Sequence, residues 1–161
     1  MIDRPFPELK IGDRQVSKGR TITETDVVHF CMLTGNWLEI HSNAEFAKHA
    51  LYGQRIVQGS LTFSIVNAML PFDPTVLEVF YGVDELRFPK PTFIGDTLWA
   101  RTEIIDLKEH HEKRHGIATL LLEGINQRSE VVMRCKFRLL IRNERLVVEI
   151  GPFRQPALAE R

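Results

Sequence analysis

The amino-acid sequence predicts an α+β protein in which a long, curved antiparallel sheet wraps around a central apolar helix. One observation is that residues 60–70 form a helix-length segment with almost no polar face. Another is that the second half of the chain holds segments of ten or more residues with alternating apolar and polar side chains, as in half-buried antiparallel strands. A chain of 161 residues is expected to form a single domain, here 1–161.

Two helices are expected ahead of the apolar one. A capping-box pair at residues 23–26 predicts a helix through VVHFCMLT that ends at Gly35. A second pair at residues 42–45 predicts a short helix, NAEFAKHAL, that stops at Gly53. His41 would then lie just ahead of this second helix.

The central helix is expected from Ser60 to Leu70, with Pro71 just beyond its end. Only Thr62, Ser64 and Asn67 interrupt its apolar residues, which are Leu61, Phe63, Ile65, Val66, Ala68, Met69 and Leu70. A helix that is apolar nearly all round must be surrounded by protein.

The strands expected to surround it are unusually long. Residues 130–142 alternate most clearly, and weaker alternation runs through 76–88, 97–107 and 116–126. A twelve-residue strand spans about 40 Å, whereas an eleven-residue helix is only about 17 Å long. Twisted antiparallel strands of this length can curl around one short helix, which is the hot-dog architecture.

The composition excludes several classes of protein. With 21 basic and 21 acidic residues, the chain lacks the basic surface that nucleic acid or an anionic membrane would favour, and it has little charge to oppose self-association. Cys31 and Cys135 match no metal or redox spacing and are expected to be reduced core thiols. No signal peptide or membrane-spanning run is apparent, so a cytoplasmic location is expected by default.

Three blocks in one order and spacing resemble the MaoC-like dehydratases and (R)-specific enoyl-CoA hydratases. They are GNWLEIH, NAEFAKHALYGQRIVQGSL and RFPKPTFIGDTLWARTEI, and the resemblance spans roughly residues 6–142. It implies a homodimer, with a higher oligomer also open, whose substrates are acyl thioesters of coenzyme A or of an acyl carrier protein. The implied reaction is reversible addition of water to a trans-2-enoyl thioester. No separate cofactor is implied, because coenzyme A enters as part of the substrate.

The resemblance also implies residue roles. His41 takes the place of the catalytic histidine, and Gly59 and Ser60 are the backbone donors at the start of the central helix that hold the thioester oxygen. Asn36 stands where the family has its catalytic aspartate, and Gln58 replaces the histidine of its His-Gly pair, at a position expected to contact substrate. Two further family positions, an asparagine and a proline, are here Leu38 and Glu39. Activity is therefore expected to be impaired.

The residues themselves leave alternatives open. An imidazole exchanges protons near neutral pH, but His41 could instead cap a helix or face solvent. Gly59 lets a substrate approach the backbone closely, but could equally serve helix–sheet packing. The amide of Asn36 cannot titrate, so it either positions a water molecule or a carbonyl, or merely follows the end of the first helix.

Other hypotheses compete with the hydratase function. The same fold serves acyl-CoA thioesterases, which would often use a carboxylate near the central helix, and residues 59–70 contain none. A non-catalytic acyl-thioester-binding protein is favoured by Asn36. A zinc site at His41, Glu45 and His49 lacks a fourth ligand, and His110, His111 and His115 are expected in a solvated turn rather than a metal clip. Three basic residues that could meet coenzyme A phosphates are Arg55, Arg87 and Lys90.

Overall fold

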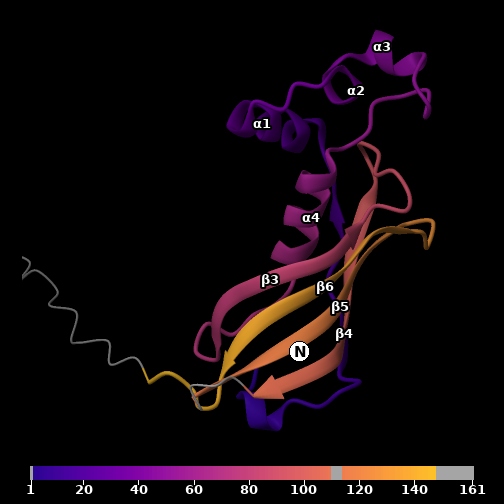
Figure 1. Cartoon of the computed structure of the whole chain (residues 1–161). Coiled ribbons are helices and arrows are strands. Elements are labelled where there is room, and N and C mark those ends of the chain that lie inside the picture. The colour runs from indigo at the N-terminus through magenta and orange to yellow at the C-terminus, as the bar shows by residue number, and fades with distance from the viewer. Residues whose placement is uncertain (1, 110–113, 148–161) are drawn as a thin grey trace, which may run out of the picture.

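The computed structural model describes residues 2–109 and 114–147, which form one six-stranded sheet with helices along its inner face and beyond one end (Figure 1). The expectations for His110 and His111 lie outside the described residues. The elements, in chain order, are η1 (Phe6–Glu8), β1 (Arg14–Val16), β2 (Arg20–Thr21), α1 (Glu24–Thr34), α2 (Glu39–Ser42), α3 (Ala44–Lys48), α4 (Gly59–Ala68), β3 (Leu77–Arg87), β4 (Thr97–Glu109), β5 (His115–Asn126) and β6 (Val131–Arg142).

The sheet has the order β1-β4-β5-β6-β3, and β2 also pairs with β4. All pairs are antiparallel. The four long strands β3 to β6 have 11, 13, 12 and 12 residues and confirm the four predicted segments. The strands β1 and β2 are too short for alternation to reveal and were not expected. With α4 lying along the curved sheet (Figure 1), the arrangement is a hot-dog fold.

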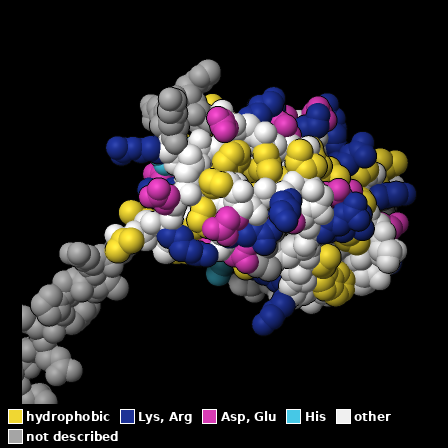
Figure 2. All heavy atoms as spheres, turned by 90° about the horizontal axis from the view of Figure 1, so that it is seen from below, with side chains coloured by type: hydrophobic (Ala, Val, Ile, Leu, Met, Phe, Trp, Pro, Cys, Tyr) yellow, Lys and Arg dark blue, Asp and Glu magenta, His cyan; other side chains and the backbone are white. Residues whose placement is uncertain are grey.

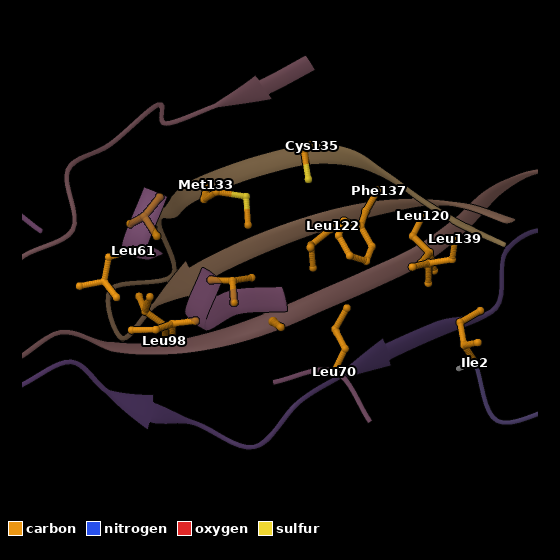
Figure 3. Packing of buried hydrophobic residues seen from close by; sticks show 14 of the residues in the cluster. Ile2, Leu61, Leu70, Leu98, Leu120, Leu122, Met133, Cys135, Phe137 and Leu139 are labelled. Atoms are coloured by element: carbon orange, nitrogen blue, oxygen red, sulfur yellow. The ribbon is translucent and has the colours of Figure 1, made fainter. Parts of the chain in front are cut away.

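The helix α4 packs its apolar residues onto the sheet. Leu61, Ile65 and Val66 are buried and join one core with the inward-facing side chains of β4, β5 and β6. Figure 3 shows Met133, Cys135 and Phe137 of β6 pointing into this core. The predicted alternation of β6 is therefore confirmed.

The expectation that protein surrounds α4 on all sides is wrong for the single chain. Ser60, Ser64 and Ala68 are exposed, and their spacing of four residues places them on one helix face. The sheet covers only the opposite face of the helix, and the open face carries small side chains.

The helices α1 to α3 lie beyond one end of the sheet, near the start of α4 (Figure 1). The capping box of α1 is present, with Thr23 as N-cap, and Gly35 ends the helix at φ 71°. The second predicted box is wrong: Asn43, rather than Ser42, caps α3 by accepting from the Phe46 N–H. The Ser42 hydroxyl instead donates to the Trp37 carbonyl, because Ser42 closes the short helix α2.

The surface mixes charges of both signs with hydrophobic side chains. Figure 2 shows basic, acidic and apolar groups interspersed on one end of the molecule. Among the described residues, no helix has the length and apolarity needed to cross a bilayer. Cys31 and Cys135 are both buried and free, as predicted, and burial raises the pKa of Cys135 to about 11.

Candidate active site

His41 lies in α2 and is buried, with 8% of its surface exposed. Its Nδ1 is 2.8 Å from the backbone oxygen of Ile56. A carbonyl oxygen can only accept a hydrogen bond, so Nδ1 carries the proton and the neutral ring keeps its lone pair on Nε2. The expectation that His41 simply faces solvent is therefore wrong, and Nε2 is the nitrogen available as a base.

A second hydrogen bond ties this part of α2 to the segment that leads into α4. The Ile56 N–H donates to the Ile40 oxygen at 3.2 Å, and the next N–H, that of Val57, donates to the Thr92 oxygen at 2.8 Å. Ile56 is thus held between α2 and the loop before β4, only three residues ahead of Gly59. These bonds hold the His41 imidazole beside the segment that begins α4.

The first turn of α4 offers backbone donors. The first backbone bond at the start of this helix runs from the Thr62 N–H to the Gln58 oxygen, at 2.9 Å. The N–H groups of Gly59, Ser60 and Leu61 precede it and have no acceptor within the helix. These N–H groups lie at the positive end of the helix dipole, where a negatively charged oxygen is stabilised.

Gly59 also has a packing role. A Cβ at this position would lie 2.9 Å from Cε2 of the Phe88 ring, closer than side-chain carbons approach one another. The ring lies against the backbone at the start of α4, so the packing interpretation of Gly59 holds whether or not a substrate also approaches there.

Gln58 is the N-cap residue of α4 and is 1% exposed. Its Nε2 donates to the Cys31 sulfur at 3.0 Å, whereas its Oε1 is buried and finds no hydrogen-bond partner among the described residues. A buried acceptor left unpaired costs roughly 1–3 kcal/mol. The contact with Cys31 was not expected, because nothing in the sequence links two residues 27 positions apart.

Asn36 directly follows the glycine that ends α1. Its backbone N–H donates to the Thr34 hydroxyl at 3.3 Å, and its half-buried side chain makes no hydrogen bond within the described residues. Asn36 and His41 therefore do not form a hydrogen-bonded pair in this structure. The imidazole is oriented by Ile56 instead.

The aspartate of the Gly-Asp-Thr-Leu segment has a structural role that sequence reasoning missed. Asp96 is 3% exposed and accepts hydrogen bonds from the side chains of Arg128 and Gln127 and from the Phe93 N–H. Burial alone would raise the pKa of Asp96, but these hydrogen bonds outweigh it and hold the pKa below its ordinary value. Asp96 is the one buried carboxylate in the described ranges.

Other candidates are engaged elsewhere. Both guanidinium ends of Arg55 bind Glu24, at 2.8 and 2.6 Å. Glu45 pairs with Lys48, and within residues 2–109 and 114–147 no three metal-binding side chains cluster.

The sequence model described as MaoC like domain matches residues 8–124 of this chain. The chain belongs to the MaoC-like family. Protein MaoC of Klebsiella aerogenes is 36% identical over 98 residues, which are 60% of this chain and 29% of that protein. The 3-hydroxybutyryl-CoA dehydratase of Methylorubrum extorquens is 30% identical over 102 residues, 63% of this chain and 64% of that enzyme. This MaoC-like chain thus spans less than two thirds of the length of either relative.

Among solved structures, this MaoC-like domain is similar to the monoamine oxidase regulatory protein from Archaeoglobus fulgius. The TM-score is 0.82 at 35% identity, over 86% of this chain and 94% of that one. The MaoC-like domain therefore accounts for most of the chain, including every candidate site residue.

Proposed function

We propose that this chain is a MaoC-like hydratase/dehydratase that adds water reversibly to a trans-2-enoyl thioester, with coenzyme A as part of the substrate. One observation carries the proposal. The buried His41 has Nδ1 committed to the Ile56 carbonyl, so Nε2 is a fixed base beside the segment that begins α4.

The reaction needs a base for the water and a donor for the developing negative charge. Nε2 of His41 takes a proton from water while the water oxygen bonds to the β-carbon of the enoyl group. The electron pair of the double bond moves toward the thioester oxygen, which accepts hydrogen bonds from the free N–H groups of Gly59 and Ser60. The α-carbon then takes the proton back from the imidazolium. His41 alone performs both proton transfers in this scheme.

Two amides assist without titrating. Asn36 positions the water or the thioester carbonyl, and the unpaired Oε1 of Gln58 accepts a hydrogen bond from water or substrate at the start of α4. Because a second positioned acid–base group typically contributes 10²–10⁴-fold, we expect the rate to lie below that of a site with an Asp–His pair.

We further propose that the working unit is a homodimer. The edge strand β3 exposes Val79 and Phe80, which are 47% and 49% accessible, and a long apolar edge strand is a template for pairing. Near the start of α4, Leu33 and Leu38 are 84% and 63% exposed. A second copy would cover such surfaces, which monomers rarely leave open.

A thioesterase is less well supported. The buried carboxylate Asp96 is held by Arg128, and α4 contains neither Asp nor Glu. One assay distinguishes the hydratase from the thioesterase. The protein is incubated with trans-2-butenoyl-CoA, and loss of the double bond and release of free thiol are followed together. Double-bond loss without thiol supports the hydratase, and thiol release supports the thioesterase.

The decisive variant is His41→Gln, which keeps a donor for Ile56 but removes the base. We expect a 10²–10⁴-fold loss of hydration rate, whereas the matched control His49→Gln, at an exposed site, should change it less than twofold. If the wild type binds the thioester without turnover, the result supports a non-catalytic acyl-thioester-binding protein. An active His41→Gln protein would remove His41 from the mechanism.

A further inference from the structure

A pocket on the sheet lies outside the candidate active site. It has a volume of about 470 Å³ and is formed by the end of β3 and the start of β6. Its lining residues are Glu85, Arg87, Leu121, Arg134, Cys135 and Lys136.

A β-bulge shapes this pocket. Asp84 pairs with Lys136 and Arg87 pairs with Arg134, so two residues of β3 stand opposite one residue of β6. One of the two, Glu85, has φ 53°, a left-handed conformation unusual for a residue with a side chain. Such bulges redirect side chains, and this one brings two arginines directly opposite each other.

The two arginines differ from their neighbours in forming no ion pair of their own within the described residues. Two carboxylates lie close to them: the charges of Arg87 and Arg134 add to the Lys136 hydrogen bond in lowering the pKa of Glu85, and Glu123 stands opposite Arg134 on β5. Both carboxylates are already bound by other side chains. Lys136 pairs with Glu85 at 2.5 Å, Arg138 with Asp84 at 2.7 Å, and Arg101 with Glu123 at 2.6 Å. Within the described ranges, by contrast, Arg134 has no ion-pair partner, and Arg87 donates only to the backbone oxygen of Leu86. Like charges directly opposite each other in a sheet are unfavourable, and a bound anion would remove that repulsion.

We propose that Arg87 and Arg134 form a binding site for a phosphate group. Two guanidinium groups present planar donor pairs that match phosphate oxygens, and the pocket has room for a diphosphate. Phe88, next to Arg87, packs on Gly59, so the site lies at the end of β3 nearest the start of α4, although the two arginines are on the opposite face of the sheet from the helix. The phosphate could therefore belong to the carrier portion of a thioester, an assignment that rests on the proposed function, or be free in solution.

The first test is calorimetric titration of the full chain with inorganic pyrophosphate at low ionic strength. We expect binding by the wild type that is weakened at least tenfold in Arg87→Gln and in Arg134→Gln. The control is Arg138→Gln, on the same strand face but paired with Asp84, which should bind within twofold of wild type. All three substituted arginines are exposed, and circular dichroism checks the fold of each variant.

Absence of pyrophosphate binding in the wild type would overturn the proposal, as would equal affinity in the two site variants and the control. Arg134→Lys provides a further check, since it keeps the charge but loses the planar donor pair, and should fall between wild type and Arg134→Gln.

A second titration identifies the source of the phosphate. If Arg134→Gln weakens coenzyme A binding but leaves pantetheine binding unchanged, the site serves the carrier; if coenzyme A is unaffected while pyrophosphate binding is lost, the site serves free phosphate. Either outcome supports a phosphate site. Neither titration involves turnover, so a failure here is separate from a failure of the hydratase assay.

Discussion

Replacing Gly124 by alanine should destabilise the contact between α4 and the sheet. Gly124 is buried on β5, and an added Cβ would lie 2.8 Å from Cγ2 of Val66, about 0.7 Å inside the normal carbon–carbon contact of about 3.5 Å. Val66 is fully buried and, as a β-branched helix residue, has one preferred rotamer. Overpacking costs about 1–3 kcal/mol, and replacing a strand glycine returns about 0.5–1 kcal/mol. The difference is a net loss of roughly 1 kcal/mol, within a range of about 0–2.5 kcal/mol.

Chemical denaturation of four proteins tests this reasoning: wild type, Gly124→Ala, Val66→Ala and the double variant. Val66→Ala alone should cost about 2 kcal/mol as a core truncation, but in the double variant the removed methyl groups make room for the new one. The double variant should therefore be about 1 kcal/mol more stable than the sum of the single changes predicts. Gly82→Ala, which meets nothing within 4 Å, is the control and should stay within about 1 kcal/mol of wild type. Additivity within about 0.5 kcal/mol would refute the close approach of Val66 to Gly124.

The remaining predictions concern the site and its support. Asn36→Asp should raise the hydration rate by about tenfold or more, toward the roughly 10²–10⁴-fold that a positioned acid–base group typically contributes. An unchanged rate in a folded protein would count against a role for this position. Gly59→Ala should lower the hydration rate about 10–100-fold if the new methyl moves the start of α4 by a fraction of an ångström. Adding Phe88→Leu to this variant should restore part of the lost rate. Wild-type activity in Gly59→Ala alone would show that only the Phe88 ring moves. Arg128→Ala should destabilise the fold, because it leaves the buried Asp96 carboxylate without its ion-pair partner. The folded-state pKa of Asp96 is lowered, so the difference in unfolding free energy between wild type and Arg128→Ala should be complete well above pH 3.8 and shrink as the pH falls below it. A difference that stays constant from pH 7 to pH 3 would contradict the assignment.

The main elements of the fold could be predicted because their signals are local. The alternation in β6 and the apolar run of α4 reflect one buried face each, and the capping box of α1 lies within four residues. The error at α3 has a local cause as well, because Ser42 and Asn43 are adjacent and both residue types cap helices. Ser42 cannot be the N-cap of α3 because it is the last residue of α2, and no periodicity in the sequence revealed that short helix.

The site was less predictable because its geometry depends on contacts between distant segments. His41 is oriented by the backbone oxygen of Ile56, and any residue at position 56 would supply that oxygen. Gln58 meets Cys31 across 27 positions, and Asp96 meets Arg128 across 32. The motifs selected the segments that hold the candidate residues, but they do not show which backbone group would orient the imidazole.

This backbone contact bears directly on the asparagine at position 36. In catalytic pairs a carboxylate has two effects: it fixes the tautomer and orientation of the histidine, and it stabilises the imidazolium that forms. Here the Ile56 oxygen, 2.8 Å from Nδ1, already provides the first effect. In the proposed mechanism, asparagine at position 36 therefore lacks only charge stabilisation, because the Ile56 oxygen rather than residue 36 orients the imidazole. A site built in this way loses rate without losing its geometry, which is why restoring one carboxylate at position 36 is expected to be sufficient to raise activity.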